Sequence, residues 1–255
     1  MRTLSLTRTQ ETGPVHRQPT DNNAAAAASK ENIMDIKSLN ESTICAFGDS
    51  TTWGDNGCGG GGNDISWTSR LGALLGGATV ENYGIKGSRI AVKADRSDSF
   101  VERLGGIDDA ADIHIVFGGV NDFSRNVPLG ELGSTDVHEF YGALDYLIRT
   151  ITARSPRSRL VFMTPCKTSG KHEKDIPASN EANHLGLTQD AYVRAMLEVC
   201  DRYSVPVIDL YAQSGISPFL PEHRELYMPD GLHYSPAGYE RLAHRIAAGL
   251  TAVCR

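Results

Sequence analysis

The fold of this chain is constrained most by five short, almost wholly apolar runs, each followed by a turn or a helical pattern. They are Thr43–Phe47, Thr79–Tyr83, Ile113–Phe117, Leu160–Thr164 and Val205–Leu210. Runs that are apolar nearly throughout suit strands that are covered on both faces. Their alternation with helical segments is typical of a parallel α/β sheet.

Helical periodicity fills the segments between these runs. Apolar residues recur at three- and four-residue spacing over Val137–Ile151, and Asp136 followed by Glu139 predicts a capping box at the start of that helix. We predict another helix from about Thr188 and a last one opened by the N-cap and first-turn pair Ser235–Pro236. Right-handed crossovers then give a five-stranded parallel sheet in a three-layer α/β/α sandwich of the flavodoxin-like type.

The N-terminal segment differs in character from the rest of the chain. Residues 1–40 are polar and irregular, so we predict a disordered tail before one domain at 41–255. Met34 is a possible functional start, and loss of folding or activity in a chain that begins there would reject this hypothesis. The tail lacks the apolar core of a secretory signal.

Charge and cysteine content narrow the possible partners and compartment. The net charge of −6 argues against a nucleic-acid-binding face, and no stretch is long enough to span a membrane as a helix. Five scattered cysteines without a CxxC pair indicate reduced thiols, and we interpret Cys45 and Cys200 as packing residues. We therefore expect a cytoplasmic protein with no nucleic-acid partner and no integral membrane segment.

Polar residues follow the first three predicted strands directly. Ser50 lies in Gly48–Gly54, where a tight turn would expose its hydroxyl. Gly87 follows the second strand and could bring a bare backbone N–H close to a ligand. Asn121, after the third strand, carries an amide with two N–H donors. In a parallel sheet these turns meet at the carboxyl ends of the strands, where ligands bind.

A fourth polar sequence precedes the last predicted helix. Asp230 and His233 lie three residues apart in a short turn, a spacing that can bring a carboxylate beside an imidazole. Taken singly, each of the four sequences is more typical of an ordinary turn, because Gly, Ser, Asn and Asp are common turn residues. Their occurrence in order, at one edge of one predicted sheet, favours a functional site.

In this combination the chain resembles the SGNH hydrolase superfamily, also called GDSL-type esterases or lipases. The resemblance runs from Ser42 to about Leu250 and is carried by GDSTTWG, the segment ending at Gly87, GVND, and DGLHYSPAGYERLA. The GxSxG elbow of standard α/β-hydrolases is absent from the sequence.

The resemblance implies a role for each matching residue. Ser50 is expected to be the nucleophile, His233 the general base, and Asp230 the carboxylate that orients the imidazole. The backbone N–H groups of Ser50 and Gly87 and the side-chain amide of Asn121 are expected to form the oxyanion hole. Acyl transfer needs these roles, because a serine hydroxyl is a weak nucleophile without a base and the tetrahedral intermediate needs donors at its oxygen.

Two segments are not explained by the resemblance. The glycine-rich loop 56–63 lies close behind Ser50 but lacks the Lys-Ser or Lys-Thr of a phosphate-binding loop, and we interpret it as a flexible insertion without a role. The charged segment Cys166–Gly186 is long for a connector, so we expect a loop on the substrate side. Its His172 and His184 lack partners at metal-binding spacing, so we predict surface histidines and no metal site.

Three residues near the expected site are candidates for substrate binding. Trp53 and Phe123 are positioned to line an acyl or alcohol pocket, although each could equally anchor its loop in the core. Arg125 follows Phe123 closely and is the third candidate. Trp67 precedes a helical stretch and is predicted to be a core residue.

The resemblance implies a cofactor-free serine carboxylic ester hydrolase that works through an acyl-enzyme. The polar Cys166–Gly186 loop favours short acyl esters, such as O-acetyl groups on a carbohydrate or small polar molecule. A lipase, lysophospholipase or thioesterase of the same fold is the alternative within this class. A flavodoxin-like nucleotide- or flavin-binding module, or a binding protein on an inactivated hydrolase scaffold, would belong to a different class, and the complete set of motifs argues against both.

Overall fold

The computed structural model describes residues 37–254. The strands are β1 (Thr43–Gly48), β2 (Thr79–Gly84), β3 (Ile113–Phe117), β4 (Arg159–Met163) and β5 (Val207–Ile208). The α-helices are α1 (Ser50–Trp53), α2 (Trp67–Leu74), α3 (Phe100–Arg103), α4 (Val120–Ser124), α5 (Phe140–Arg154), α6 (Gln189–Arg202), α7 (Leu210–Gln213), α8 (Pro221–Tyr227) and α9 (Pro236–Val253). Single 3-10 turns span Leu39–Glu41, Leu104–Gly106 and His172–Lys174. Most of the predicted tail, with the possible start at Met34, lies outside the described residues.

The strands form one parallel sheet in the order β2-β1-β3-β4-β5. In its register Ala46 of β1 lies between Asn82 of β2 and Ile115 of β3. The sequence-based prediction of a flavodoxin-like sheet is thus confirmed. The strand order reverses between β1 and β3, and in such sheets the crevice beyond the carboxyl ends at this point is where ligands bind.

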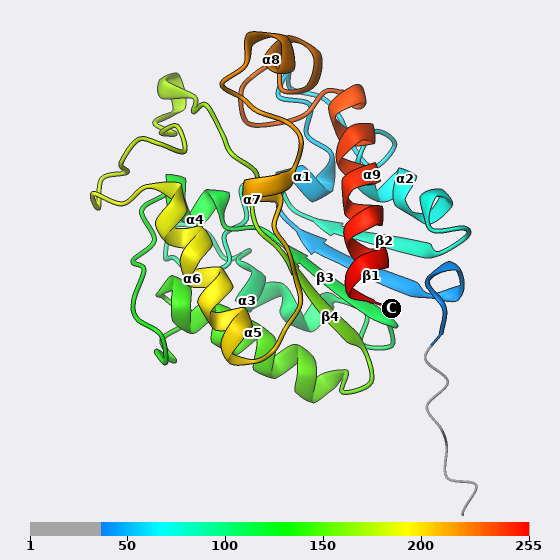
Figure 1. The fold of residues 1–255 in the computed structure, drawn as a ribbon. Helices are drawn as coiled ribbons and strands as arrows, with labels where there is room; N and C mark the ends of the chain where they lie inside the picture. The colour runs from blue at the N-terminus through cyan, green and yellow to red at the C-terminus, as the bar shows by residue number, and fades with distance from the viewer. Residues whose placement is uncertain (1–36, 255) are drawn as a thin grey trace, which may run out of the picture. The chain divides into compact units, whose positions relative to one another are not determined.

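Alternate residues of β1 enter two separate cores, one on each face of the sheet. Cys45 and Phe47 pack into the core under α3, α5 and α6, whereas Ile44 and Ala46 pack into the core under α2 and α9. Figure 1 shows these two groups of helices on opposite sides of the strands. Trp67 is fully buried in the second core, as predicted.

The start of α5 corrects one prediction. The helix begins at Phe140 and neither Asp136 nor Glu139 forms a capping box. The Glu139 carboxylate instead accepts a hydrogen bond of 2.7 Å from Ser134 Oγ, and Asp136 accepts one of 2.9 Å from the His138 N–H. Because the helix begins only at Phe140, Glu139 occupies the N-cap position instead of the third helical position that a capping box requires.

The predicted last helix is confirmed, including its cap. Ser235 Oγ accepts a hydrogen bond of 3.1 Å from the Gly238 N–H, and Pro236 occupies the first position of α9. The helix α6 begins after Thr188, as predicted, and buries Cys200, which confirms that this cysteine is a packing residue. The position of α9 matters for the site because His233 lies immediately before its cap.

The edge strand β5 is shorter than the apolar run that predicted it. Only Val207–Ile208 pairs with β4. Pro206 has no N–H to donate to a ladder. Asp209 ends the strand as the N-cap of α7, and its side chain accepts a hydrogen bond of 3.1 Å from the Ala212 N–H.

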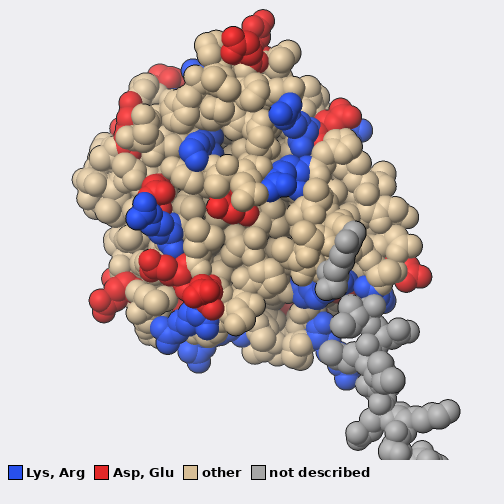
Figure 2. Space-filling model, in the orientation of Figure 1, with Lys and Arg blue, Asp and Glu red and all other residues tan. Residues whose placement is uncertain are grey.

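Charged side chains are distributed in small groups of both signs on the face drawn in Figure 2, with no continuous basic stripe there. None of the helices within residues 37–254 combines the length and apolar character required to cross a membrane.

Candidate active site

Ser50 stands in a tight turn where β1 passes into α1. A β-carbon on Gly48 would lie 1.9 Å from Thr52 Oγ1, so only glycine allows α1 to fold back so closely onto the strand end. Asp49 caps the helix, because its Oδ1 accepts a hydrogen bond of 2.9 Å from the Thr51 N–H. The Ser50 side chain is thereby held at the carboxyl edge of the sheet next to the β1/β3 switch point.

His233 and Asp230 reach this serine from the turn before α9. His233 Nε2 lies 3.1 Å from Ser50 Oγ, and His233 Nδ1 lies 2.8 Å from Asp230 Oδ2. Asp230 Oδ1 also accepts the backbone N–H groups of Leu232 at 2.9 Å and of His233 at 2.7 Å. The structure thus brings together the three residues that the sequence singled out, in one hydrogen-bonded chain.

The charge on Asp230 determines which imidazole nitrogen carries the proton. Burial acts to raise the pKa of Asp230, but hydrogen bonds from His233 and from Lys171 outweigh it and hold the pKa well below its usual value. An ionised carboxylate only accepts, so Nδ1 must donate to it. In the neutral ring this leaves the Nε2 lone pair for the Ser50 hydroxyl.

The expected oxyanion donors of Gly87 and Asn121 lie in the segments that follow β2 and β3. Asn121, in α4, donates from Nδ2 to the Ser88 carbonyl at 3.0 Å and to Asp49 Oδ2 at 3.3 Å. Burial raises the pKa of Asp49 to about 6. The backbone of Gly87 has a φ of 75°, and within residues 37–254 its N–H has no hydrogen-bond acceptor.

Asp122 fastens the Gly87 segment to α4. Its two carboxylate oxygens accept the N–H groups of Ile90 and Ala91, each at 2.9 Å, and the side chain is fully buried. Burial raises the pKa of Asp122 to about 7. Asp122 therefore supports the relative position of Gly87 and Asn121 and is a residue that the sequence did not single out.

Arg103 ties together the ends of β1 and β2. Its guanidinium donates to the carbonyls of Gly48 and Tyr83 and to Ser88 Oγ, and it lies 4.4 Å from the ring centroid of Phe47. Burial lowers the pKa of Arg103 to about 10. The turns that carry Ser50 and Gly87 are thus connected through one partly buried cation, for which the sequence offers no motif.

The glycine-rich loop lies against the site, contrary to the prediction of a flexible insertion without a role. A β-carbon on Gly57 would lie 2.4 Å from Asp230 Cγ. Just before it, Asp55 Oδ2 lies 3.8 Å from His233 Nε2 and 2.9 Å from Lys86 Nζ. The reason is tertiary: the Asp55 carbonyl accepts a hydrogen bond of 2.8 Å from the hydroxyl of Tyr239, in α9, which holds the loop beside His233.

The Cys166–Gly186 loop also reaches the site. Lys171 Nζ lies 2.7 Å from Asp230 Oδ2, and both side chains are almost fully buried. The loop was expected on the substrate side, but a contact between one of its lysines and Asp230 was not predicted.

The three candidate substrate-binding residues lie in different surroundings. Phe123, in α4, is fully buried and packs edge-on against Tyr192, which favours the alternative of a core anchor. Trp53 is partly buried with Lys86 Nζ 4.1 Å from its ring centroid. Arg125 is exposed and donates to the Lys174 carbonyl at 3.2 Å.

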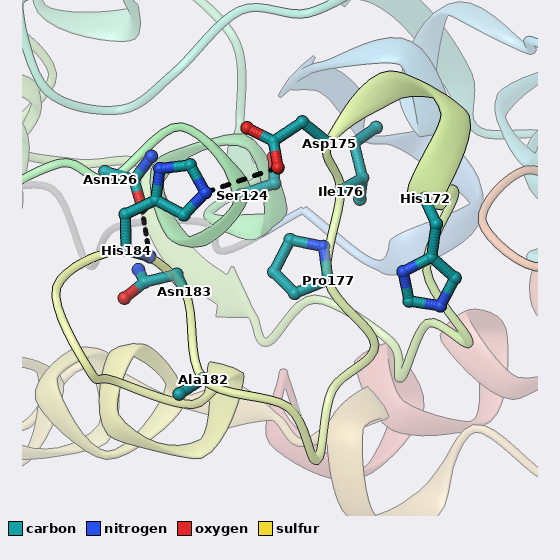
Figure 3. A pocket seen from close by; sticks show the side chains of 9 residues that line it. All are labelled: Ser124, Asn126, His172, Asp175, Ile176, Pro177, Ala182, Asn183 and His184. Carbon is teal, nitrogen blue, oxygen red and sulfur yellow. Dashed lines mark hydrogen bonds and ion pairs between the residues drawn. The ribbon is translucent and has the colours of Figure 1, made fainter.

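His172 and His184 are exposed, as predicted, at opposite ends of a surface pocket beside α4 (Figure 3). His184 Nε2 lies 3.3 Å from Asp175, and His172 Nε2 lies 3.8 Å from Glu181. Within residues 37–254, no cluster of three or more His, Cys, Asp or Glu side chains is suited to hold a metal ion.

The chain matches one protein family and several solved structures. The model of the GDSL-like Lipase/Acylhydrolase family matches residues 46–241. No curated protein matches the chain. One crystal structure contains a chain 91% identical to this one; the match covers 86% of this chain and 100% of that one, with a TM-score of 0.85. A protein from Lactobacillus plantarum is 29% identical over 84% of this chain and 98% of its own, with a TM-score of 0.74. The lipase/acylhydrolase from Enterococcus faecalis, at 21% identity over 83% of this chain and 96% of its own, has a TM-score of 0.58 and a similar fold.

Proposed function

This chain belongs to the GDSL-like lipase/acylhydrolase family and is an SGNH-type serine esterase, and we propose that Ser50, His233 and Asp230 are its catalytic triad. One observation carries the proposal. Ser50 Oγ, the imidazole of His233 and the Asp230 carboxylate form an unbroken hydrogen-bonded chain, with contacts of 3.1 and 2.8 Å, at the edge of the sheet where ligands bind.

Acylation starts with proton transfer within this chain. The Ser50 hydroxyl proton passes to His233 Nε2 as Oγ attacks the carbonyl carbon of the ester. The resulting imidazolium is stabilised by Asp230, which keeps its charge throughout. Collapse of the tetrahedral intermediate breaks the bond to the alcohol, which leaves with the proton from Nε2.

The negative oxygen of the intermediate requires donors that are already in place. We assign this role to the backbone N–H groups of Ser50 and Gly87 and to the Asn121 amide. Support comes from the buried contacts of Asp122 and the partly buried contacts of Arg103, which fix the segments that carry these donors.

Deacylation repeats the same steps with water. His233 takes a proton from the water as its oxygen attacks the acyl carbon, and the acid leaves as the proton returns to Ser50 Oγ. Atoms balance: one ester and one water give one acid and one alcohol. Residues of the chain supply every group that the reaction needs, so the proposal includes no cofactor.

We propose short acyl esters of a carbohydrate or small polar molecule as substrates, with acetyl esters first. The charges near His233 beyond the triad support this. Asp55 Oδ2 lies 3.8 Å from His233 Nε2 and is paired with Lys86 at 2.9 Å, so this side of the imidazole presents charged groups that do not suit a long acyl chain. A polar alcohol, in contrast, would find both a carboxylate and an ammonium group there.

The test is hydrolysis of p-nitrophenyl acetate, butyrate, octanoate and palmitate by the wild type, by Ser50→Ala and by the control Ser69→Ala, which removes an exposed hydroxyl on α2. Cleavage that is lost only in Ser50→Ala, with an optimum at acetate, is expected. Acetate release from peracetylated sugars then tests the alcohol part.

Other outcomes are informative. An optimum at octanoate or palmitate would contradict the short-chain proposal and favour a lipase, in which case the exposed Phe219, Leu220 and Leu226 around α8 become candidates for lipid contact. Activity that survives Ser50→Ala in clean protein would contradict the triad.

A further inference from the structure

We propose that Lys171 is a positioning residue that extends the activity of His233 to lower pH by sharing the Asp230 carboxylate with it. The proposal rests on the proposed function of Ser50, His233 and Asp230. It assigns a role to a charged residue outside the four motifs that carry the family resemblance.

The position of Lys171 is built into the fold. Its backbone N–H donates to the Ile176 carbonyl at 2.8 Å, and its carbonyl accepts a hydrogen bond of 3.2 Å from the Ile176 N–H, which closes a small hairpin. Two residues earlier, the Ser169 N–H donates to the Gly231 carbonyl at 2.9 Å, directly after Asp230. The hairpin is thereby attached to the turn that carries the carboxylate.

The side chain of Lys171 is buried against a single anion. Its Nζ lies 2.7 Å from Asp230 Oδ2, and the two side chains are 9% and 11% exposed. Desolvation of an ammonium group is costly unless it is paired, so a lysine at this position is stable only in contact with the carboxylate. The same Oδ2 atom accepts the hydrogen bond from His233 Nδ1 at 2.8 Å.

Because Lys171 and His233 both contact Asp230 Oδ2, the charge of the lysine also acts on the imidazole. Asp230 stabilises the positively charged imidazolium, whereas the ammonium group bound to the same oxygen opposes it. Lys171 therefore favours the neutral ring, which is the form that can accept the Ser50 proton. A second effect is geometric, because the ion pair restrains the rotation of the carboxylate.

Other charged groups near His233 also influence the balance between its neutral and protonated forms. Asp55 Oδ2 lies 3.8 Å from Nε2 and is paired with Lys86 at 2.9 Å. Asp49 is buried beneath Ser50 and interacts with the imidazole through its charge. These groups lie on elements other than the loop that carries Lys171, so a substitution at Lys171 leaves them in place.

Two neutral substitutions separate charge from hydrogen bonding. Lys171→Met removes both, whereas Lys171→Gln keeps a donor without the charge, and Lys171→Arg keeps the charge. Asp230 retains the N–H groups of Leu232 and His233 and the His233 ring as donors in each case. Lys167→Met is the matched control, since Lys167 is in the same loop but donates to the Tyr211 carbonyl at 2.7 Å.

The experiment measures kcat/KM for p-nitrophenyl acetate from pH 4 to 9 for each variant, together with the wild type and Ser50→Ala. We expect the midpoint of the acid limb to move to higher pH by about one unit or more in Lys171→Met and Lys171→Gln. Lys171→Arg and Lys167→Met are expected to keep the wild-type midpoint.

A drop in activity that is uniform with pH in both neutral variants would overturn the proposal and leave Lys171 a purely structural role. Profiles that superimpose on the wild type would also overturn it, and if Ser50→Ala is inactive in the same series, the proposed function stands without the inference. Activity that persists in Ser50→Ala would instead overturn the proposed function itself.

Discussion

The backbone of Gly57 lies in direct contact with the carboxylate of Asp230, since a β-carbon on Gly57 would lie 2.4 Å from Asp230 Cγ. The glycine-rich loop thus contacts the same carboxylate as the Lys171 ammonium group, which lies 2.7 Å from Oδ2. Asp230 is confined both by the main chain at Gly57 and by the ion pair with Lys171. This confinement fixes the oxygen that accepts the hydrogen bond from His233.

Gly57→Ala is expected to reduce both activity and stability. Gly57 has a φ of 74°, which costs an L-residue about 1–2 kcal/mol. In addition, the new methyl group must displace Asp230, so kcat/KM is expected to fall by at least about tenfold. The measurement is kcat/KM for p-nitrophenyl acetate alongside a thermal unfolding curve.

Gly59→Ala provides the matched control. Its φ of 82° carries the same backbone cost, but nothing lies within 4 Å of its β-carbon position. The control is expected to lose stability and to keep its activity. Equal activities in the two variants would show that the contact between Gly57 and Asp230 is irrelevant to the reaction.

The parts of the site that were predictable from the sequence are those encoded in short stretches. Ser50 and Asn121 follow apolar runs that predict strands of one parallel sheet, and the topology of such a sheet places their turns at one edge. Asp230 and His233 are close because three residues separate them. Local chemistry also made the cap of α9 at Ser235 predictable.

The unpredicted parts depend on contacts between distant segments. Lys171 meets Asp230 across 59 positions of sequence, and Arg103 meets Gly48 across 55. Asp55 comes beside His233 because the hydroxyl of Tyr239 holds its backbone. No local pattern encodes such pairings, and a glycine-rich loop gives no sign of what its backbone touches.

Asp122 makes the stability of the protein depend on pH. Burial raises the pKa of Asp122 from 3.8 to about 7, so the folded state binds its proton more tightly than the unfolded chain does. The contribution of this group is therefore fully present below about pH 4 and is lost as pH rises to about 7. Asp49, whose pKa burial raises to about 6, acts in the same direction.

Asp122→Asn is expected to reduce this dependence. Asparagine does not titrate, so the free energy of unfolding decreases less between pH 4.5 and 8 than in the wild type. The decrease that persists in the variant is due to Asp49 and other titratable groups. One of the N–H groups of Ile90 and Ala91 loses its acceptor, at a cost of about 1–3 kcal/mol. Urea unfolding at both pH values, with the exposed Asp64→Asn as control, measures both effects. If the free energy of unfolding decreased between the two pH values as much as in the wild type, Asp122 would not be a source of the pH dependence.

Asn121→Ala tests the side-chain donor of the oxyanion hole. Loss of one such donor lowers kcat by about 10²–10³, because the interaction is made mainly in the transition state. KM is expected to change little. Steady-state kinetics on p-nitrophenyl acetate distinguish the roles, since a rise in KM at constant kcat would make Asn121 a ground-state binding residue instead.

Asp55 and Lys171 carry opposite charges and act on opposite nitrogens of His233, Lys171 indirectly. Asp55 Oδ2 lies 3.8 Å from Nε2, whereas Lys171 acts at the Nδ1 side through Asp230. Burial acts to raise the pKa of Asp55, but the Gly57 N–H and Lys86 outweigh it and the pKa is lowered, so the carboxylate is ionised at neutral pH. An ionised carboxylate at this distance stabilises the imidazolium.

Asp55→Asn should therefore change the pH profile in the direction opposite to Lys171→Met. Removing the carboxylate charge destabilises the imidazolium, and Lys86, now without its partner at 2.9 Å, adds to the same effect. The acid limb of kcat/KM is expected to move to lower pH. In the wild type Asp55 Oδ1 accepts the Gly57 N–H at 2.9 Å, and the asparagine side-chain oxygen can accept the same bond, so the loop should keep its place.

The double variant Asp55→Asn/Lys171→Met separates charge from loop displacement. Shifts of the same sign in both single variants would mean that loop displacement, and not charge, governs the pH profile. Opposite shifts that cancel in the double variant would show that the two groups act on one imidazole.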